Sequence, residues 1–219
     1  METRARLNRE RVLATAIALA DESGVEALSM RRLATQLEVV PMALYKHVAN
    51  KEQLLDGMVD AIIAEIERVP FAGDWRSAVR QQVLVARAAL QRHSWARRVI
   101  ETRVGKSPEV LDYIEAFAAL FLAGGFTADL AHHAMHALGG RMWGFTQEVF
   151  EDAAPAPELP PEAMRQLALR YPSILAIARP HDDSVVGDGC DDQFEFEFAL
   201  DLLLEGFDRL KQQAWSSRA

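Results

Sequence analysis

The residues best suited to chemistry lie in one short segment, PMALYKHVANK at 41–51. Leu44 and Val48 are spaced i and i+4, so in a helix they would share one face and turn inward. The side chains left to project are Pro41, Met42, Ala43, Tyr45, Lys46 and His47. The major groove of DNA admits a helix, and a helix that reads it must expose side chains that reach base edges and phosphates. This segment meets those demands.

The chain lacks the motifs of the common catalytic sites. It contains no G-x-S-x-G, P-loop, H-E-x-x-H or dinucleotide fingerprint. Its single cysteine, Cys190, lies in an acidic loop, which disfavours a reactive thiolate. We therefore expect a protein that is not an enzyme and that carries no cofactor.

Three neighbouring histidines, His132, His133 and His136, suggest a metal site. The first and third would share a helix face, and imidazole is a common metal ligand. No third ligand follows nearby in the sequence. A solvated or hydrogen-bonded pair is therefore favoured, and we expect no metal; metal binding by His132 and His136 is the alternative.

Composition sets the class of protein. The 219 residues are 50% hydrophobic and 26% charged, which is the balance of a folded globular chain. Lys and Arg total 24 against 32 Asp and Glu, and the net charge of -8 argues against a protein that coats nucleic acid over its whole surface. One cysteine cannot close an intrachain disulfide, and no run approaches the ~20 apolar residues that span a bilayer. We expect a cytoplasmic protein with no membrane partner.

Charge is nevertheless distributed unevenly. Lys and Arg outnumber acids in residues 1–51, whereas acids dominate the rest of the chain. A mildly positive N-terminal part on an acidic body is typical of a DNA reader with a separate sensing or assembly domain, because only the reading surface must attract phosphate.

Apolar residues recur at intervals of three and four along the chain, so the predicted fold is all-α. The FEFEF run at 194–198 alternates like a strand, but its flanks continue a helical pattern and a lone strand would have no partner. The expected helices cover residues 8–22, 29–37, 41–48, 51–68, 75–93, 108–123, 127–152, 161–171 and 191–215. Three are expected to begin at the N-caps Asn8, Ser29 and Asn50. Gly24 is expected to end the first helix in a left-handed conformation.

A break containing Pro and Gly at 70–73 marks the predicted domain boundary. Residues 1–51 are expected to form a three-helix helix-turn-helix DNA-binding domain, and helix 51–68 to connect it to the body. Residues 69–219 are expected to form a helical ligand-binding and dimerisation domain.

Ordered motifs within residues 8–55 resemble the DNA-binding domain of the tetracycline repressor (TetR) family of bacterial regulators. They are A-x-x-L-x-x-E-x-G at 16–24, L-S-M-R-R-L-A at 28–34, and L-Y-x-H-V followed by N-K at 44–51. The helical remainder is similar to the C-terminal domain of the same family. The resemblance implies phosphate contacts from Arg31, Tyr45, His47 and Lys51, and base contacts from residues 41–43 and Lys46.

Glu38 departs from the family pattern, which usually has glycine at the start of the turn. Either Glu38 takes a left-handed backbone, which would cost a residue with a side chain about 1 kcal/mol, or the turn is reshaped. Met42 and Ala43 suit thymine methyl groups and Lys46 suits guanine, so the operator is expected to differ from that of the tetracycline-responsive members.

A ligand pocket is expected among the helices of the body. Candidate lining residues are Trp95, Phe117, Phe121, Met142 and Trp143, although for each of them a place in the core is favoured. Tetracycline-binding members of the family place a magnesium-chelating histidine before G-x-x-P, whereas Arg103 precedes V-G-K-S-P in this chain. Glu148 matches the acidic partner, but without the histidine we do not expect tetracycline. Arg103 suits an anionic or carbonyl ligand.

One copy of a helix-turn-helix implies a two-fold dimer, because such proteins bind paired half-sites. The resemblance points to an interface made by helix 127–152 and the last helix, with candidate contacts at Phe196, Leu200, Leu203 and Phe207. The predicted function is a homodimeric repressor that binds a palindromic operator in double-stranded DNA and is released by a small-molecule effector. The alternative is an all-helical small-molecule carrier or interaction protein whose reading helix no longer binds DNA.

Overall fold

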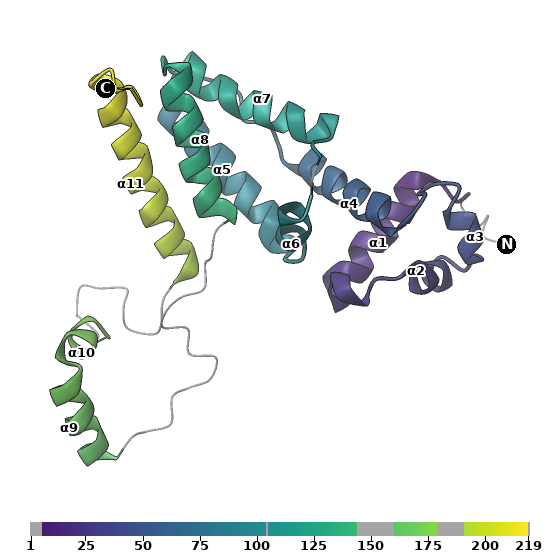
Figure 1. Cartoon of the computed structure of the whole chain (residues 1–219), viewed down its shortest axis with the longest axis horizontal. Coiled ribbons are helices and arrows are strands. Elements are labelled where there is room, and N and C mark those ends of the chain that lie inside the picture. Colours follow the sequence, from purple (N-terminus) through teal and green to yellow (C-terminus); the bar gives the residue numbers. More distant parts are fainter. Residues whose placement is uncertain (1–5, 104, 144–159, 179–190, 219) are drawn as a thin grey trace. The chain divides into compact units, whose positions relative to one another are not determined.

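The computed structural model describes residues 6–103, 105–143, 160–178 and 191–218, and every regular element in these ranges is helical (Figure 1). In chain order they are α1 (Arg9–Ser23), the 3-10 helix η1 (Val25–Ala27), α2 (Met30–Gln36), α3 (Pro41–Leu44), α4 (Lys51–Glu65), α5 (Trp75–Arg92), α6 (Ala96–Glu101), α7 (Pro108–Ala123), α8 (Ala128–Trp143), α9 (Pro161–Arg170), α10 (Pro172–Ala178) and α11 (Asp192–Gln212). The predicted all-α fold is confirmed.

The chain divides into two compact units. The first unit consists of Met1–Trp143 and Phe207–Ala219, and contains α1 to α8 and the end of α11. The second consists of Gly144–Gly206, and contains α9, α10 and the beginning of α11. The domain boundary predicted between residues 51 and 69 lies inside the first unit and stays a prediction.

Local sequence signals fix the beginnings of the N-terminal helices. The side chains of Asn8, Ser29 and Asn50 each accept a hydrogen bond from the backbone N–H three residues ahead, at 2.8, 3.2 and 2.7 Å. Each bond satisfies a donor that has no partner within its helix, so the three predicted N-caps are confirmed. Gly24 ends α1 with a positive φ of 80°, but its ψ of 152° is extended rather than left-handed. The chain therefore passes directly into η1.

The structure corrects several predicted helix limits. α3 ends at Leu44 rather than at residue 48, and residues 45–47 form a turn. α4 ends at Glu65 rather than at residue 68, because Ile66 takes an extended backbone with φ -71° and ψ 109°. η1, α6 and α10 were not predicted, since three to seven residues are too few to show a repeating apolar face. The FEFEF run lies in α11, as predicted, whereas residues 144–152 of the predicted helix 127–152 lie outside the described residues.

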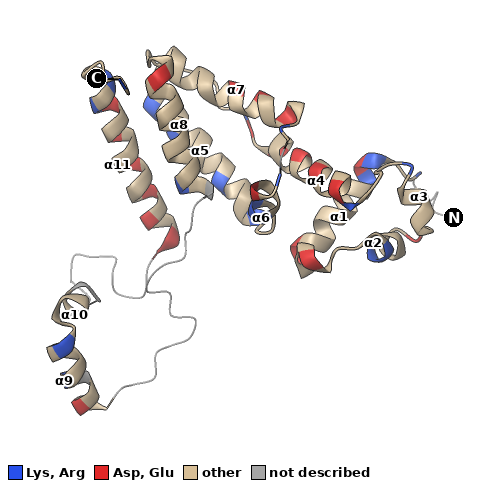
Figure 2. Cartoon of the chain, viewed as in Figure 1, with Lys and Arg blue, Asp and Glu red and all other residues tan. Residues whose placement is uncertain are grey.

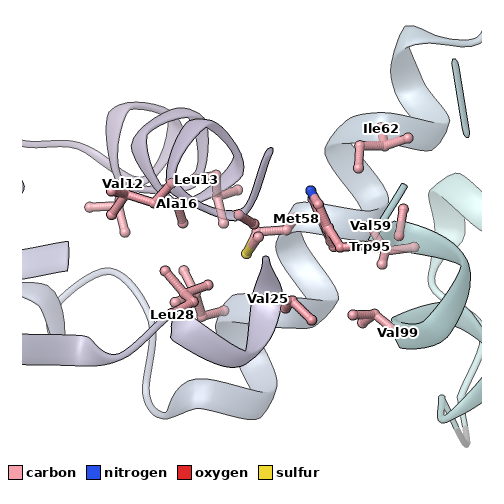
Figure 3. Close-up of a cluster of buried hydrophobic side chains, with 14 of the residues drawn as sticks. Val12, Leu13, Ala16, Val25, Leu28, Met58, Val59, Ile62, Trp95 and Val99 are labelled. Carbon is pink, nitrogen blue, oxygen red and sulfur yellow. The ribbon is translucent and has the colours of Figure 1, made fainter. Parts of the chain in front are cut away.

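One hydrophobic core joins the N-terminal helices to the body of the first unit (Figure 3). The labelled buried side chains in Figure 3 come from α1, the segment around η1, α4 and the segment around α6: Val12, Leu13, Ala16, Val25, Leu28, Met58, Val59, Ile62, Trp95 and Val99. α4 supplies the middle of this cluster. The position of α1 is therefore coupled through packed side chains to α4 and α6.

An aromatic cluster holds α5, α7 and the turn before α8 together. Trp75 lies edge-on to Phe126, with ring centroids 4.6 Å apart, and Phe121 lies edge-on to Phe126 at 5.1 Å and to Phe117 at 5.5 Å. Edge-to-face contacts suit the charge distribution of aromatic rings. The ammonium nitrogen of Lys211 lies 5.8 Å from the Trp75 ring centroid and 5.6 Å from that of Phe126, which attaches the end of α11 to the cluster.

α11 is apolar on two sides. Its buried side chains are Phe196, Leu200, Leu204 and Phe207. Phe194, Phe198 and Leu202 follow one another at four-residue spacing and are 45%, 55% and 55% exposed. Acidic residues occur along the same helix (Figure 2). Among the described helices, none is both long enough and apolar enough to cross a membrane.

Candidate DNA-binding face and ligand cavity

The turn between α2 and α3 is a Schellman motif with Glu38 at the position usually taken by glycine. The N–H of Val39 donates to the carbonyl of Ala34 at 2.9 Å, and the N–H of Glu38 donates to the carbonyl of Thr35 at 3.0 Å. The φ of Glu38 is 53°, so of the two possibilities that the sequence left open the backbone is left-handed and the turn is not reshaped. Pro41 then begins α3, where its fixed φ suits the first helical position.

α3 exposes one side and buries the other. Leu44 and Val48 are 0% and 1% exposed, so both face inward as the spacing predicted. Met42 and Tyr45 are 71% and 45% exposed. Val40, just before the helix, is 68% exposed, and the sequence analysis did not single it out because an exposed valine has no motif of its own. Pro41 and Lys46 are also exposed, and Ala43 and His47 are half-buried.

The polar side chains around α3 are available to a partner. Five of them form no hydrogen bond or ion pair with any described residue: Arg31, Tyr45, Lys46, His47 and Lys51. Arg32 differs, because its Nη2 donates to the Ser23 hydroxyl at 2.8 Å and ties α2 to the end of α1. Figure 2 shows basic residues on α2 and at the beginning of α1. Cations that have no partner in the described part of the chain suit a chain of phosphates.

A cavity of about 290 Å³ is lined by α4, α7, α8, the end of α6 and the segment that follows α6. Its apolar side chains come from Val59, Ile63, Ile100, Val110, Ile114, Phe117, Met135 and Met142. The charged residues on its described lining are Arg103 and Lys106, and both are cationic. The volume is near the lower end of small-molecule pockets, and the mainly apolar lining is typical of them.

Tyr113 brings a polar atom to the lining of this cavity. The residue is 8% exposed, and its hydroxyl has no hydrogen-bond partner among the described residues. Burial raises the pKa of the Tyr113 phenol to about 12, although the charge of Arg68, whose guanidinium lies 5.0 Å from the ring centroid, opposes the shift. The hydroxyl is therefore neutral at neutral pH and can donate or accept a hydrogen bond.

Arg103 connects the cavity lining to two carboxylates of α4. Its Nε lies 3.2 Å from Oδ1 of Asp56, and its Nη1 lies 3.2 Å from Oδ1 of Asp60 and donates to the Asp56 carbonyl at 3.3 Å. The hydroxyl of Ser107 donates to the same Asp60 oxygen at 2.6 Å and accepts from the N–H of Val110 at 3.3 Å, which caps α7. One network therefore links α4, Arg103 and the beginning of α7.

A second cavity, of about 420 Å³, shares Arg103, Gly105 and Lys106 with the first. Its other lining residues include Arg9 of α1 and Glu52 of α4. The segment around Arg103 is therefore common to the apolar cavity and to a more polar space beside the N-terminal helices.

Two family models match the chain. The model described as bacterial regulatory proteins of the tetR family matches residues 12–58, and the model of the tetracyclin repressor-like C-terminal domain matches residues 70–210. The chain belongs to the TetR family. The resemblance of the N-terminal motifs and of the helical body is thereby confirmed, and the first match covers the helix-turn-helix of this TetR-family chain.

Individual relatives agree with this assignment. The class D tetracycline repressor of Escherichia coli is 30% identical over 209 residues, which are 93% of this chain and 90% of that protein. The repressor DrrR1 of Streptomyces coeruleorubidus is 35% identical over 55% of this chain, and a regulator of Saccharopolyspora erythraea is 34% identical over 58%. The matched segments span 46% and 55% of those two proteins, so this TetR-family chain covers about half of their length.

A solved structure extends the likeness to three dimensions. Apo ActR from Streptomyces coelicolor is 27% identical, with a TM-score of 0.74 over 96% of this chain and 99% of that chain. ActR has also been solved in complex with actinorhodin, and that structure is 25% identical with a TM-score of 0.66 over 93% and 97% of the two chains. The TetR-family fold is therefore shared across nearly the whole length.

Three predicted pocket residues of the TetR-family chain line the apolar cavity: Arg103, Phe117 and Met142. Sequence analysis missed Tyr113 and Lys106, which line it too. It also missed Val59 and Ile63 of α4, although their i and i+4 spacing shows that they share one helix face.

Other predicted pocket residues lie elsewhere. Trp95 belongs to the core shared with α1, and its indole N–H donates to Asp21 at 2.7 Å. Phe121 is 0% exposed within the aromatic cluster. The side chain of Trp143 and the whole of Glu148 lie outside the described residues. Their roles in ligand binding stay predictions.

Most of the predicted interface residues of α11 are already buried in the single chain. Phe196, Leu200 and Phe207 are buried, and Leu203 is half-buried. Phe194, Phe198 and Leu202, which the sequence analysis did not select, are the exposed large apolar residues of α11. Helical spacing showed two apolar faces but not which of them the chain covers.

The histidines of α8 form a ring cluster on an exposed surface. The centroids of His132 and His136 are 4.5 Å apart, and the His133 ring lies edge-on to Trp215 at 5.5 Å. Nε2 of His133 lies 3.6 Å from Asp129, whose carboxylate also accepts hydrogen bonds from the backbone and side chain of Ser217. In the described part of the chain, no group of three or more His, Cys, Asp or Glu side chains could hold a metal ion.

Proposed function

We propose that this chain is a transcriptional repressor that binds a palindromic operator as a homodimer and releases it when a small molecule enters the apolar cavity. One observation carries the proposal. Residues 40–47, which are α3 and the residues on either side of it, expose apolar side chains and the cation Lys46, which has no partner among the described residues, and buried Leu44 and Val48 anchor this segment. Such a surface is free to enter the major groove.

The roles at the DNA divide by chemistry. Arg31, Tyr45, His47 and Lys51 bind phosphates and orient the reading helix without selecting sequence. Lys46 donates to guanine, and Pro41, Met42 and Ala43 contact base edges, Met42 and Ala43 through thymine methyl groups. We add Val40 to the apolar part of this surface, because its side chain is 68% exposed beside Met42.

α4 couples the cavity to the reading helix. Val59 and Ile63 of α4 line the cavity, while Met58 and Ile62 belong to the core shared with α1. Lys51, at the other end of the same helix, is a proposed phosphate contact. A ligand that fits the cavity better when α4 is displaced shifts the population toward dimers whose reading helices no longer match the operator.

The exposed apolar stripe of α11 supports the homodimer. Phe194, Phe198 and Leu202 occupy one helix face, and we propose that this face, rather than the buried Phe196, Leu200 and Phe207, supplies most of the contact from α11. A two-fold dimer places its reading helices at half-sites ~34–36 Å apart, which is one turn of DNA.

The test is a fluorescence-anisotropy titration against short duplexes taken from the DNA that flanks the gene, at two salt concentrations. Wild type is expected to bind one duplex as a dimer and more tightly than scrambled DNA. Tyr45→Ala and Arg31→Gln are expected to weaken binding to every duplex, and Arg31→Gln is expected to reduce the salt dependence by about one phosphate contact. Arg165→Gln on α9 removes the same charge from a helix outside the helix-turn-helix and is expected to change neither.

Weak binding that is equal for every duplex would overturn the repressor proposal. It would favour an all-helical small-molecule carrier, whose apolar cavity would then be its functional site. Specific binding by Tyr45→Ala at wild-type strength would instead overturn the assigned DNA-binding face.

A further inference from the structure

The apolar cavity carries one sign of charge. Its described lining is aliphatic and aromatic apart from two cations, Arg103 and Lys106, and the hydroxyl of Tyr113. Lys106 is exposed and forms no ion pair with a described residue. The Tyr113 hydroxyl is buried without a partner, and a buried polar group in that state calls for a ligand or water that satisfies it. The lining therefore fits a molecule that is mostly apolar and carries oxygen atoms with negative charge.

Arg103 uses only part of its hydrogen-bonding capacity. A guanidinium has five N–H donors. Nε faces Asp56, and Nη1 serves both Asp60 and the Asp56 carbonyl. Nη2 has no acceptor among the described residues. One nitrogen of a cation on the cavity lining is therefore open to a ligand.

A bidentate ligand cannot use this nitrogen alone. An oxyanion binds arginine best through two parallel N–H groups, either Nη1 with Nη2 or Nε with Nη2. The first pair requires the nitrogen that now serves Asp60, and the second requires the nitrogen that now faces Asp56. Bidentate binding therefore removes one α4 acceptor from Arg103: the Asp56 carboxylate for the second pair, and the Asp60 carboxylate or the Asp56 carbonyl for the first.

We propose that the effector is a mainly apolar molecule with one oxyanion, such as a carboxylate, and that this oxyanion takes Arg103 from Asp56 or Asp60. The inference rests on the proposed function, because it names the effector class of the same cavity. Tyr113 donates a hydrogen bond to the ligand, and Lys106 adds a second positive charge.

The exchange destabilises the present position of α4. The Asp60 side chain is 17% exposed, so its carboxylate is poorly solvated once the guanidinium leaves, and among the described residues it keeps the hydrogen bond from Ser107. Moving α4 returns the carboxylate to water. α4 begins at Lys51, close in sequence to the reading helix. The displacement of α4 that the charged ligand causes therefore reaches the DNA-binding face.

The test compares two fluorescent probes that differ by one charge. Anilinonaphthalene sulfonate is apolar with one oxyanion, and phenylnaphthylamine has the same ring system without it. Both are titrated into the full chain as wild type, Arg103→Gln, Asp60→Asn and Arg97→Gln. Arg97 is the matched control, because it lies on α6, pairs with Glu101 and does not line the cavity. Thermal unfolding of each variant reports whether it is folded.

Arg103→Gln is expected to weaken the sulfonate probe about tenfold or more and to leave the neutral probe within about twofold. Asp60→Asn is expected to bind the sulfonate probe several-fold more tightly, because the Asp60 carboxylate no longer competes for Arg103. A misfolded variant would instead bind both probes more weakly. Arg97→Gln should match wild type. Equal affinity of the sulfonate probe for wild type and Arg103→Gln, or weaker binding by folded Asp60→Asn, would overturn the inference.

Operator binding measured on the same samples separates this inference from the proposed function. If wild type binds its operator but Arg103 and Asp60 have no effect on the charged probe, only the effector class is wrong. If wild type binds no duplex specifically, the repressor proposal is wrong whatever the probes report.

Discussion

Replacing Glu38 by glycine is expected to raise the free energy of unfolding, because this residue holds a left-handed backbone at the end of α2. Its φ is 53°. That conformation costs a residue with a side chain about 1–2 kcal/mol. Glycine avoids the cost but loses more backbone entropy on folding, by about 0.5–1 kcal/mol. The net gain is about 0.5–1 kcal/mol, which for a chain of this size corresponds to a rise in Tm of about 1–4 °C.

Two other helix ends provide internal comparisons. Ala214 closes α11 at φ 49° with the same pair of backbone hydrogen bonds and no charge, so Ala214→Gly is expected to give a similar gain. Gly125 closes α7 in this way at φ 82°, so Gly125→Ala is expected to lose about 1 kcal/mol. Glu38→Gln removes the carboxylate but keeps the strained backbone, and it separates the effect of charge from that of conformation.

The assay is urea unfolding followed by far-ultraviolet circular dichroism, at one protein concentration for all variants. Ala214→Gly should shift the midpoint upward, Gly125→Ala should shift it downward, and Glu38→Gly should have a higher midpoint than Glu38→Gln, which lacks the same carboxylate. The reasoning fails if Glu38→Gly is no more stable than Glu38→Gln. It also fails if Gly125→Ala costs nothing, since all three ends share one hydrogen-bond pattern.

Three further predictions concern the core and the cavity. Gly124→Ala would place a Cβ against the Cβ and Cγ of Trp75, so overpacking should lower stability by about 1–3 kcal/mol, and a wild-type urea midpoint would contradict this contact. Asp21→Asn removes the carboxylate whose oxygens lie 2.9 and 3.0 Å from Nδ1 of His93. It should lower the free energy of unfolding by about 1–3 kcal/mol, measured by thermal unfolding. An unchanged Tm would show that the contact between Asp21 and His93 adds no stability. Because burial raises the pKa of Tyr113 from 10.0 to about 12, the folded state favours the neutral phenol, and the stability this contributes is complete below pH 10.0 and is lost as the pH rises toward 12. Tyr113→Phe should flatten that decline, and tyrosinate absorbance that is complete near pH 10 in the folded protein would refute the assignment.

Local signals predicted the fold well because they act within a few residues. Asn8, Ser29 and Asn50 cap their helices whatever lies elsewhere in the chain, and the apolar repeat fixed the longer helices. The short elements could not be found in this way. α6 has six residues, and its side chains reach the core because α4 and α1 lie beside it, which is a tertiary cause.

The sequence predicted the DNA-binding face better than it predicted the ligand cavity, for the same reason. The burial of Leu44 and Val48 followed from their spacing, because it depends on one short segment, although the helix ends at Leu44. The cavity is lined by residues from several helices. The aromatic character of a residue therefore could not show that Phe117 lines the cavity whereas Trp95 lies in the core shared with α1. Tyr113 was missed because only packing decides that its hydroxyl has no partner.

The continuous core of α1, α4 and α6 has a consequence for engineered chimaeras. A cut at residue 51, where the DNA-reading helices end in sequence, would separate Val12 and Leu28 from Met58 and Ile62, which pack in the same cluster. A transplanted reading module must therefore carry α4 with it, and its new host must present side chains that match Trp95 and Val99. Compatibility at this buried seam, more than the choice of operator, would decide which recombinant regulators fold.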